Sequence, residues 1–367
     1  MSIYNMPWKL VWNRLRGCGG REIDRFRGIF PPVDDENGSE AWIGSDTKAL
    51  GATEENPIGC SEVMLPDGKR EFLYRVIEQA PMEILGKKHI EKNGKCLGIL
   101  VKLLDAQESF AMEAHPTRNV AKKIWNSEYG KEESWYILGT RDDVREPAFV
   151  YLGFKEGVTK ERFAELYDKG DLSALEELCH KIQVKPGDAF MIRGGLPHAL
   201  GAGCFALEVQ EPSDIGVTPL PQSALAEYYR SCGCEMEMQD EGKYRSDIIE
   251  TFVYEGRSRE KNLEKWYIPG KIIRNGIWGK EVLLAGPDQT EYFSYTRLDV
   301  DGQASVRNTG FPQIAVVIDG EGSFIHKEGS MEVKKGDELF LPYNIPEASV
   351  KGKLSIIFCH PEGASVE

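Results

Sequence analysis

An internal repeat constrains the fold of this 367-residue chain more than any other feature of its sequence. One copy, Val184–Ala199, reads VKPGDAFMIRGGLPHA, and the other, Val333–Ala348, reads VKKGDELFLPYNIPEA. In both copies a Gly-Asp turn precedes an apolar run, a second turn and a proline. A tight turn followed by an apolar run is typical of a strand in a β-domain. Because the match covers a complete turn–strand–turn unit, we interpret it as a duplicated β-domain.

Short apolar runs between glycines and prolines continue this pattern along the chain. Runs that are rich in β-branched and aromatic residues and bounded by turn residues predict the strands of a β-sandwich or barrel. The predicted strands include Leu97–Leu104, Ala148–Phe154, Ala189–Ile192, Phe205–Val209, Ala315–Ile318 and Leu354–Cys359.

Helical periodicity is confined to a few segments. Thr117 is the predicted N-cap of the first segment, and the residues from Asp168 to Ser173 predict a break between two others. The sequence therefore predicts a mainly β fold with a small helical insertion. The predicted helices are Thr117–Asn126, Lys160–Asp168, Leu172–Ile182 and Ser223–Tyr229.

Composition excludes several classes of protein. With 41% hydrophobic residues the chain is expected to be globular, and its net charge of −14 disfavours binding to nucleic acid. No apolar run is long enough for a signal peptide or a membrane span, so we expect a cytoplasmic, soluble protein. Eight cysteines are too few for a disulfide scaffold, and we interpret Cys232 and Cys234 as ordinary thiols.

A candidate metal site begins in the segment FAMEAHP, Phe110–Pro116. On a strand, Glu113 and His115 face one side, whereas Met112 and Ala114 face the other. Polar side chains directed into a barrel are costly unless a partner compensates them. A divalent ion is a natural partner for imidazole and carboxylate groups.

Two more residues can complete a set of two histidines and two carboxylates. His198 ends the first copy of the repeat, and Glu133 lies in KEESWYIL. The alternative is a pair of hydrogen-bonded core histidines without a metal, but the Glu-x-His pair and the Gly-Asp…Pro-His unit together favour a metal site. The second copy has Glu347 in place of His198, so we expect only the first domain to bind metal. The remaining histidines are expected to be structural or exposed: His89, His180, His326 and His360.

The spacing from Gly187 through Arg193 and Gly195 to His198 resembles the second metal motif of the cupin superfamily. More narrowly, the chain resembles type I mannose-6-phosphate isomerases, and Ser39–Ser45, SEAWIGS, is similar to the Glu-x-Trp segment of that family. The other matching segments, in the order of the family, are VKLLDAQESFAMEAHPTRNVAKK, GKEESWYIL, PGDAFMIRGGLPHALGAGCFALEVQEPSD and VVIDGEGSFIHKEGSMEVKKGDELFLPYNIPEA.

The resemblance implies a zinc-dependent aldose–ketose isomerase with tandem jelly-roll cupin domains and one divalent metal ion per chain. It also implies active-site roles for Lys102 and Lys131, although each could instead be a solvated surface amine. Carried over by position, the implied metal ligands are Glu113, His115, Glu133 and His198.

We predict three parts of the chain on this basis. A catalytic, metal-binding cupin domain comprises 1–116 and 131–222, with helical segments at 117–130 and 157–182. A connecting segment, 223–284, contributes strands. The C-terminal part, 285–367, is a degenerate cupin domain.

The implied reaction moves a carbonyl between C1 and C2 of a sugar. This step removes the proton beside the carbonyl, and bound Zn²⁺ can stabilise the resulting enediolate as a Lewis acid. A lysine near the metal can act as a base, because burial and the positive ion both disfavour its ammonium form. Alternatively, the lysine stays charged and pairs with the phosphate of the substrate.

The chain departs from the family pattern at several positions. Glu113 replaces a glutamine, which adds negative charge to the metal site and should tighten metal binding while weakening Lewis acidity, or change the preferred metal. Ala111 replaces a serine. Ser213-Asp214 leads into Ile-Gly-Val-Thr instead of a Thr-Thr-Tyr-Arg stretch whose arginine is important for catalysis. Arg193 replaces a proline and is a candidate for restoring this cation.

The sequence thus predicts an enzyme of carbohydrate metabolism that interconverts mannose 6-phosphate and fructose 6-phosphate. The alternatives are an isomerase of another or an unphosphorylated sugar, a non-catalytic sugar-binding cupin and an Fe(II) cupin oxygenase. We expect a small sugar phosphate as partner, no nucleic acid or membrane, and a monomer or homodimer.

Overall fold

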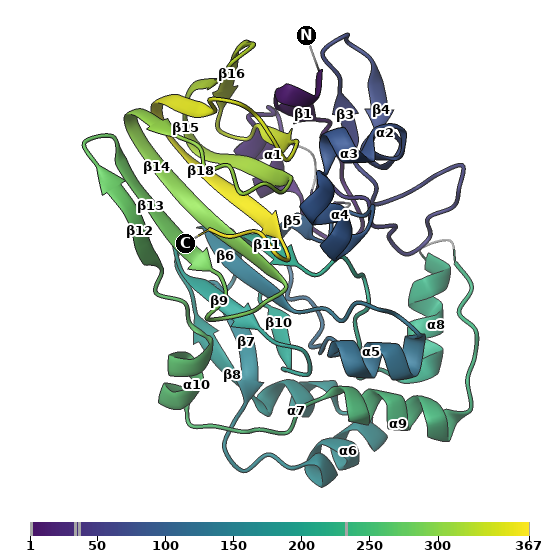
Figure 1. Ribbon diagram of the computed structural model, residues 1–367. Helices are drawn as coiled ribbons and strands as arrows, with labels where there is room; N and C mark the ends of the chain where they lie inside the picture. Colours follow the sequence, from purple (N-terminus) through teal and green to yellow (C-terminus); the bar gives the residue numbers. More distant parts are fainter. Residues whose placement is uncertain (1–2, 33–34, 36–37, 232–233, 367) are drawn as a thin grey trace.

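The computed structural model describes residues 3–32, 35, 38–231 and 234–366, and Figure 1 shows the arrangement of their helices and strands. Cys232 lies outside the described residues. The predicted mainly β architecture is confirmed, because three antiparallel sheets make up the body of the molecule. In the described part of the chain, no helix is both long enough and apolar enough to span a membrane.

Two sheets are built from strands that lie between Glu40 and Gln210. A five-stranded sheet has the order β2-β5-β11-β6-β9, and a three-stranded sheet has the order β10-β7-β8. Their strands are β2 (Glu40–Ile43), β5 (Leu100–Asp105), β6 (Glu133–Thr140), β7 (Phe149–Phe154), β8 (Cys179–Gln183), β9 (Ala189–Ile192), β10 (His198–Leu200) and β11 (Cys204–Gln210).

The third sheet has ten strands in the order β12-β13-β14-β18-β15-β17-β1-β3-β4, with β16 paired to β15. Three short amino-terminal strands extend the C-terminal strands here, because β1 pairs with β17. The strands are β1 (Trp8–Leu10), β3 (Glu62–Met64), β4 (Arg70–Phe72), β12 (Lys271–Gly276), β13 (Gly279–Ala285), β14 (Phe293–Ser305), β15 (Gln313–His326), β16 (Gly329–Lys334), β17 (Glu338–Leu341) and β18 (Ser349–Pro361).

The two copies of the sequence repeat adopt the same local structure. Gly187 and Gly336 have φ angles of 95° and 89°, a left-handed conformation that glycine adopts without strain. Asp188 and Asp337 each accept a hydrogen bond of 2.9 Å from the backbone N–H three residues earlier. The following strands, β9 and β17, pair with β6 and β15, respectively. These matching contacts support duplication of a β-domain.

The helices differ from the prediction in two ways. The predicted helix Leu172–Ile182 is wrong beyond Glu177, because residues 179–183 form β8 and pair with β7. The sequence interpretation also missed the helices α1 to α4, α9 and α10. The helical segments are a 3-10 turn (Ile3–Asn5), α1 (Arg21–Arg27), α2 (Leu73–Gln79), α3 (Pro81–Ile84), α4 (Lys87–Asn93), α5 (Arg118–Trp125), α6 (Lys160–Asp168), α7 (Leu172–Glu177), α8 (Gln222–Ser231), α9 (Glu241–Thr251) and α10 (Arg259–Trp266).

The helical insertion gathers below the three-stranded sheet, where α5, α6, α7 and α9 lie together in Figure 1. Thr117 is the N-cap of α5, as predicted, and its side chain accepts a hydrogen bond from the backbone N–H of Val120. An apolar cluster joins this helical group to the sheet through Phe154 of β7, Phe163 of α6 and Ile248 of α9. These helices therefore pack against one side of the three-stranded sheet.

Candidate active site

A cavity of about 690 Å³ opens in the first half of the molecule, against the five-stranded sheet. Its wall contains all but two of the residues that the sequence proposed for the site. Lys102 comes from β5, Glu133 from the start of β6 and His198 from the start of β10. Glu113 and Lys131 come from the loops between these strands.

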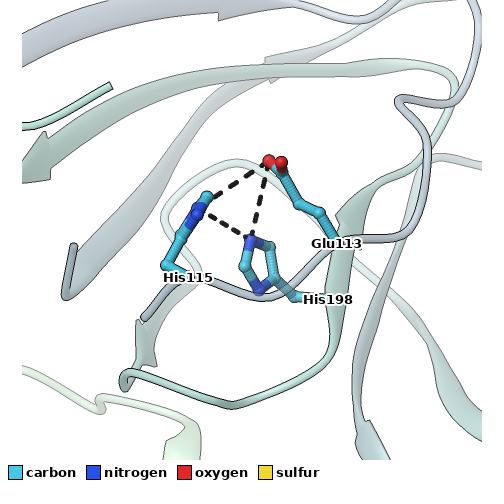
Figure 2. A group of neighbouring side chains, drawn as sticks. All are labelled: Glu113, His115 and His198. Atoms are coloured by element: carbon cyan, nitrogen blue, oxygen red, sulfur yellow. Dashed lines mark hydrogen bonds and ion pairs between the residues drawn. The ribbon is translucent and has the colours of Figure 1, made fainter. Parts of the chain in front are cut away.

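The segment around Glu113 is extended but is not part of a regular strand. Glu113 forms an isolated bridge with His198, in which each backbone N–H donates a 2.9 Å hydrogen bond to the carbonyl of the other residue. Met112 and Ala114 are buried in the apolar cluster shared with the helices. Glu113 and His115 point to the opposite side, where Figure 2 shows them directed toward His198. The predicted alternation of faces is therefore confirmed.

Backbone carbonyls fix the orientation of both imidazoles. Nδ1 of His115 lies 3.2 Å from the carbonyl oxygen of Ile215, and Nδ1 of His198 lies 2.8 Å from that of Leu196. A carbonyl oxygen can only accept, so each Nδ1 carries the proton and each Nε2 presents a lone pair. The two Nε2 atoms are 3.2 Å apart. This tautomer and orientation are those of metal-binding histidines.

Two carboxylates converge on the same point. Glu133 Oε2 is 3.0 Å from Nε2 of His115, and Glu133 Oε1 is 3.5 Å from Nε2 of His198. Glu113 Oε1 is farther away, 3.7 Å from His115 Nε2 and 4.0 Å from His198 Nε2. The ammonium of Lys131 contacts this cluster, 2.8 Å from His115 Nε2 and 3.1 Å from Glu133 Oε2. The imidazole lone pairs of His115 and His198 and the two carboxylates are directed at one point, beside the Lys131 ammonium. Two imidazoles and two carboxylates form a ligand set that fits a divalent cation.

The ionisation of the buried groups favours the forms that bind metal. Burial and the neighbouring His115 lower the pKa of His198 to about 4, so His198 is neutral near pH 7. Burial opposes ionisation of Glu133, but Lys131 and His115 outweigh it and hold the pKa of this carboxyl well below its ordinary value. Burial also opposes the charge of Lys131, but Glu133 and then Glu208 raise its pKa above the ordinary value.

Lys102 lies in the wall of the cavity, beside the Glu-x-Trp segment. Its Nζ is 3.1 Å from Glu208 Oε1 and 3.8 Å from Glu40 Oε2, and it lies 4.9 Å from the centroid of the Trp42 ring. The indole N–H of Trp42 donates a 2.8 Å hydrogen bond to Glu40. Lys102 and Lys131 are both buried, so neither is a solvated surface amine.

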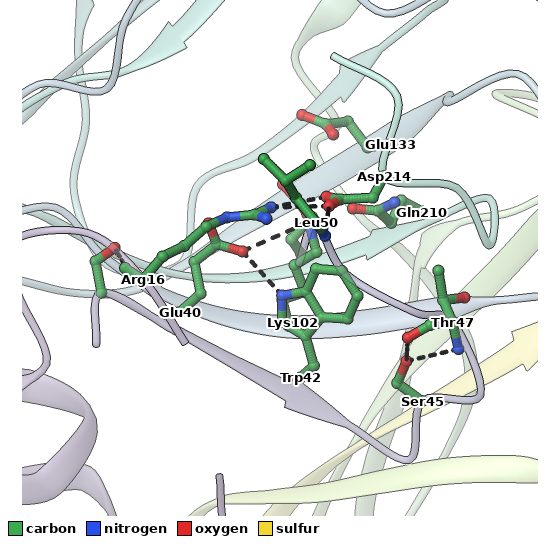
Figure 3. A network of polar contacts seen from close by, with 12 residues as sticks. Arg16, Glu40, Trp42, Ser45, Thr47, Leu50, Lys102, Glu133, Gln210 and Asp214 are labelled. Atoms are coloured by element: carbon green, nitrogen blue, oxygen red, sulfur yellow. Dashed lines mark hydrogen bonds and ion pairs between the residues drawn. The ribbon is translucent and has the colours of Figure 1, made fainter. Parts of the chain in front are cut away.

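The structure does not bring Arg193 to the cavity. Its side chain is 46% exposed and lies 2.9 Å from Glu132 Oε1, and it also donates to the carbonyl of Gln289. A different arginine, Arg16, lines the cavity and contacts Asp214 (Figure 3). The sequence interpretation missed Arg16 because no motif connects it to residues about two hundred positions away.

The other histidines lie apart from this cluster. His89 and His180 are buried and contact the backbone carbonyls of Cys96 and Arg257, at 2.7 Å and 2.9 Å. His89 and His180 are therefore structural, which is one of the two outcomes that the sequence predicted for them. Among the described residues, the group of three metal-ligating side chains within reach of one ion is Glu113, His115 and His198, with Glu133 against both imidazoles.

Comparison with known proteins agrees with this architecture. Residues 287–361 match the family model described as mannose-6-phosphate isomerase, cupin domain. Mannose-6-phosphate isomerase ManA of Bacillus subtilis is 29% identical over 265 residues, which cover 71% of this chain and 74% of the relative. The mannose-6-phosphate isomerase of Streptococcus mutans is 26% identical over 305 residues, covering 80% and 85%. The resemblance to type I mannose-6-phosphate isomerases of the cupin superfamily is therefore confirmed.

Solved structures of proteins named mannose-6-phosphate or phosphomannose isomerases share the fold of this chain over nearly its full length. The mannose 6-phosphate isomerase from Bacillus subtilis has a TM-score of 0.75 at 23% identity, covering 96% of this chain and 99% of that one. A phosphomannose isomerase variant from Salmonella typhimurium has a TM-score of 0.72 at 15% identity, covering 97% and 99%. The predicted cupin fold is therefore confirmed, whereas the roles of individual site residues stay predictions.

Proposed function

We propose that this protein is a metal-dependent aldose–ketose isomerase that interconverts mannose 6-phosphate and fructose 6-phosphate. The observation that carries the proposal is the convergence of two imidazole lone pairs and two carboxylates in the wall of a cavity large enough for a small ligand. Relatives named mannose-6-phosphate isomerases match most of the chain and support the choice of substrate.

We propose Zn²⁺ as the ion and Glu113, His115, Glu133 and His198 as its ligands. When bound, Zn²⁺ supplies a Lewis acid for the negative oxygen of an enediolate. His115 and His198 present Nε2 lone pairs, and Glu133 is held as a carboxylate. Glu113, which lies farther from both imidazoles, completes the set.

Lys131 and Lys102 are the proposed groups for proton transfer and substrate orientation. Lys131 donates to His115 Nε2 in the structure, and it loses this acceptor when that lone pair is occupied by the ion. Its ammonium then keeps Glu133 as a partner and can hold or move a proton at an oxygen of the sugar. Lys102, paired with Glu208, lies on the same wall and can orient the sugar hydroxyls.

The remaining sequence expectations stay predictions. We propose the catalytic domain at 1–116 and 131–222, the connecting segment at 223–284 and the degenerate domain at 285–367. A monomeric or homodimeric state and a cytoplasmic location are likewise proposals.

A coupled assay with mannose 6-phosphate tests the function. We expect turnover in the purified protein, its loss after treatment with a chelator and its return with Zn²⁺. His198→Ala should lower both metal content and turnover at least about 100-fold, because it removes a ligand. The matched control Arg193→Ala removes a cation outside the cavity and should leave both unchanged. Consumption of oxygen, or turnover that survives complete removal of metal, would contradict the proposal.

A further inference from the structure

The cationic side chains that line the cavity differ in their exposure to solvent. Lys102 and Lys131 are buried, with side chains that are 4% and 7% exposed. Arg16 also lines the cavity, but its side chain is 24% exposed, and Lys48 is 45% exposed and paired with Glu54. The exposed fraction of the cations therefore rises from Lys102 and Lys131 to Arg16 and then to Lys48.

Arg16 is oriented by two carboxylates and an aromatic ring. Its Nη2 donates to both carboxylate oxygens of Asp214, at 2.8 and 3.1 Å, and its Nε donates to Glu40 at 3.3 Å. The guanidinium lies 5.8 Å from the centroid of the Trp42 ring. Figure 3 shows the Arg16 guanidinium directed toward Asp214. Among the described residues the Nη1 group has no hydrogen-bond partner, so the guanidinium keeps free donors.

Asp214 connects Arg16 to the candidate metal ligands. The next residue, Ile215, accepts from Nδ1 of His115 through its carbonyl. Within the described part of the chain, the hydrogen-bond donors to the Asp214 carboxylate are Arg16 and, at 3.4 Å, the backbone N–H of Leu50. Asp214 thus binds the Arg16 guanidinium on the wall of the cavity. An anion that enters the cavity would displace Asp214 from Arg16.

We infer that Arg16 binds the phosphate of the substrate at the outer part of the cavity, with Asp214 as its partner when no substrate is present. This inference rests on the proposed function, which places C1 and C2 of the sugar at the metal ligands. The phosphate on C6 is at the far end of the sugar and therefore points away from Lys131 toward Arg16. The planar guanidinium matches phosphate oxygens in a bidentate geometry.

If Arg16 binds phosphate, substitutions of Arg16 and Asp214 should have different effects on substrate binding. If the two residues form only a structural ion pair, the effects should be the same. A phosphate beside Arg16 is repelled by the Asp214 carboxylate, so the two anions compete for one guanidinium. Removing Arg16 should weaken binding of the phosphate, whereas neutralising Asp214 should not. If the pair only positions the segment that follows Asp214, either substitution breaks it and the two variants should behave alike.

The experiment compares KM and kcat for Arg16→Gln and Asp214→Asn with mannose 6-phosphate. Arg16→Gln should raise KM about 10- to 100-fold with little change in kcat, because it removes charge-assisted hydrogen bonds to phosphate. Asp214→Asn should lower KM, because it removes the anion that competes with phosphate for Arg16. Arg16→Lys keeps the positive charge but loses the planar guanidinium that can bind two phosphate oxygens. Its KM should therefore lie between those of the wild type and Arg16→Gln. Arg14→Gln is the matched control, since Arg14 pairs with Asp24 outside the cavity wall.

A binding measurement separates this inference from the proposed function. Inorganic phosphate should raise the melting temperature of the wild-type protein and of Arg14→Gln but not of Arg16→Gln, whether or not the protein isomerises a sugar. The inference would be overturned if Arg16→Gln and Asp214→Asn raised KM by the same factor. It would also be overturned if Arg16→Gln left KM unchanged. Absence of turnover in the wild type would overturn the proposed function alone.

Discussion

Glu113 differs from the other acidic residue of the metal cluster in both distance and exposure. Its side chain is 30% exposed, whereas that of Glu133 is 1% exposed. Its nearest oxygen is 3.7 Å from His115 Nε2, compared with 3.0 Å for Glu133. Of the two proposed acidic ligands, Glu113 is therefore the more exposed and the one more distant from the imidazoles.

Glu113→Gln should weaken metal binding about 10-fold and should not lower the turnover of the metal-loaded enzyme. The amide keeps an oxygen for the ion but removes one negative charge from its surroundings, which leaves more Lewis acidity. Metal affinity can be measured by competition with a chromogenic chelator, and turnover by the coupled assay at saturating Zn²⁺. Unchanged affinity would show that Glu113 does not contact the ion.

At the scale of elements, the short segment after Ser213 packs against the proposed metal ligands His115 and Glu113. Ile215 accepts from His115, and Val217 forms a backbone bridge with Ala114. Between them Gly216 lies against Glu113, so closely that a Cβ at this position would be 2.4 Å from Glu113 Oε2. The space for a side chain at Gly216 is therefore limited by the Glu113 carboxylate and not by the backbone conformation.

Gly216→Ala should reduce metal affinity to about the level of Glu113→Gln while the protein stays folded. The methyl group would meet the end of a flexible side chain, so Glu113 would move away from the imidazoles and the backbone would remain in place. Metal competition and thermal unfolding measure the two effects. Gly139→Ala in β6 is the control, because its Cβ would meet Phe205 at 3.5 Å, an ordinary contact. A large loss of stability in Gly216→Ala would contradict this account.

At the scale of the whole molecule, histidines are buried in a neutral form in both halves. His198 lies in the metal cluster, and His360 lies in β18 of the large sheet. Burial lowers the pKa of His360 to about 3, and its Nδ1 has no hydrogen-bond partner among the described residues. A group with a lowered pKa in the folded state stabilises the protein above the unfolded pKa, and this contribution is lost as the pH falls.

We expect the metal-free protein to lose stability as the pH falls from about 6.5, the ordinary pKa of histidine, toward 3. At pH 5 protonation of His360 in the unfolded state alone should account for about 2 kcal/mol. His360→Gln should therefore show a smaller difference in unfolding free energy between pH 7.5 and pH 5 than the wild type, measured by denaturant titration. An equal pH dependence in the two proteins would show that the folded state does not lower the pKa of His360.

Local patterns in the sequence determined the features that depend on neighbouring residues. The Gly-Asp turns at Gly187 and Gly336, the N-cap at Thr117 and the opposite faces of Glu113 and Ala114 all follow from backbone geometry over a few residues. These features sufficed to predict a duplicated β-fold and to identify the candidate metal ligands.

Only the tertiary structure decided which distant side chains meet. Residues 179–183 became a strand because β7 offers them a partner, although their sequence continued a helical pattern. Arg16 meets Asp214, and Arg193 turns outward to Glu132, through contacts between segments that no local period connects. The direction of a long charged side chain depends on the carboxylates that surround it, and those are set by the packing of the whole chain.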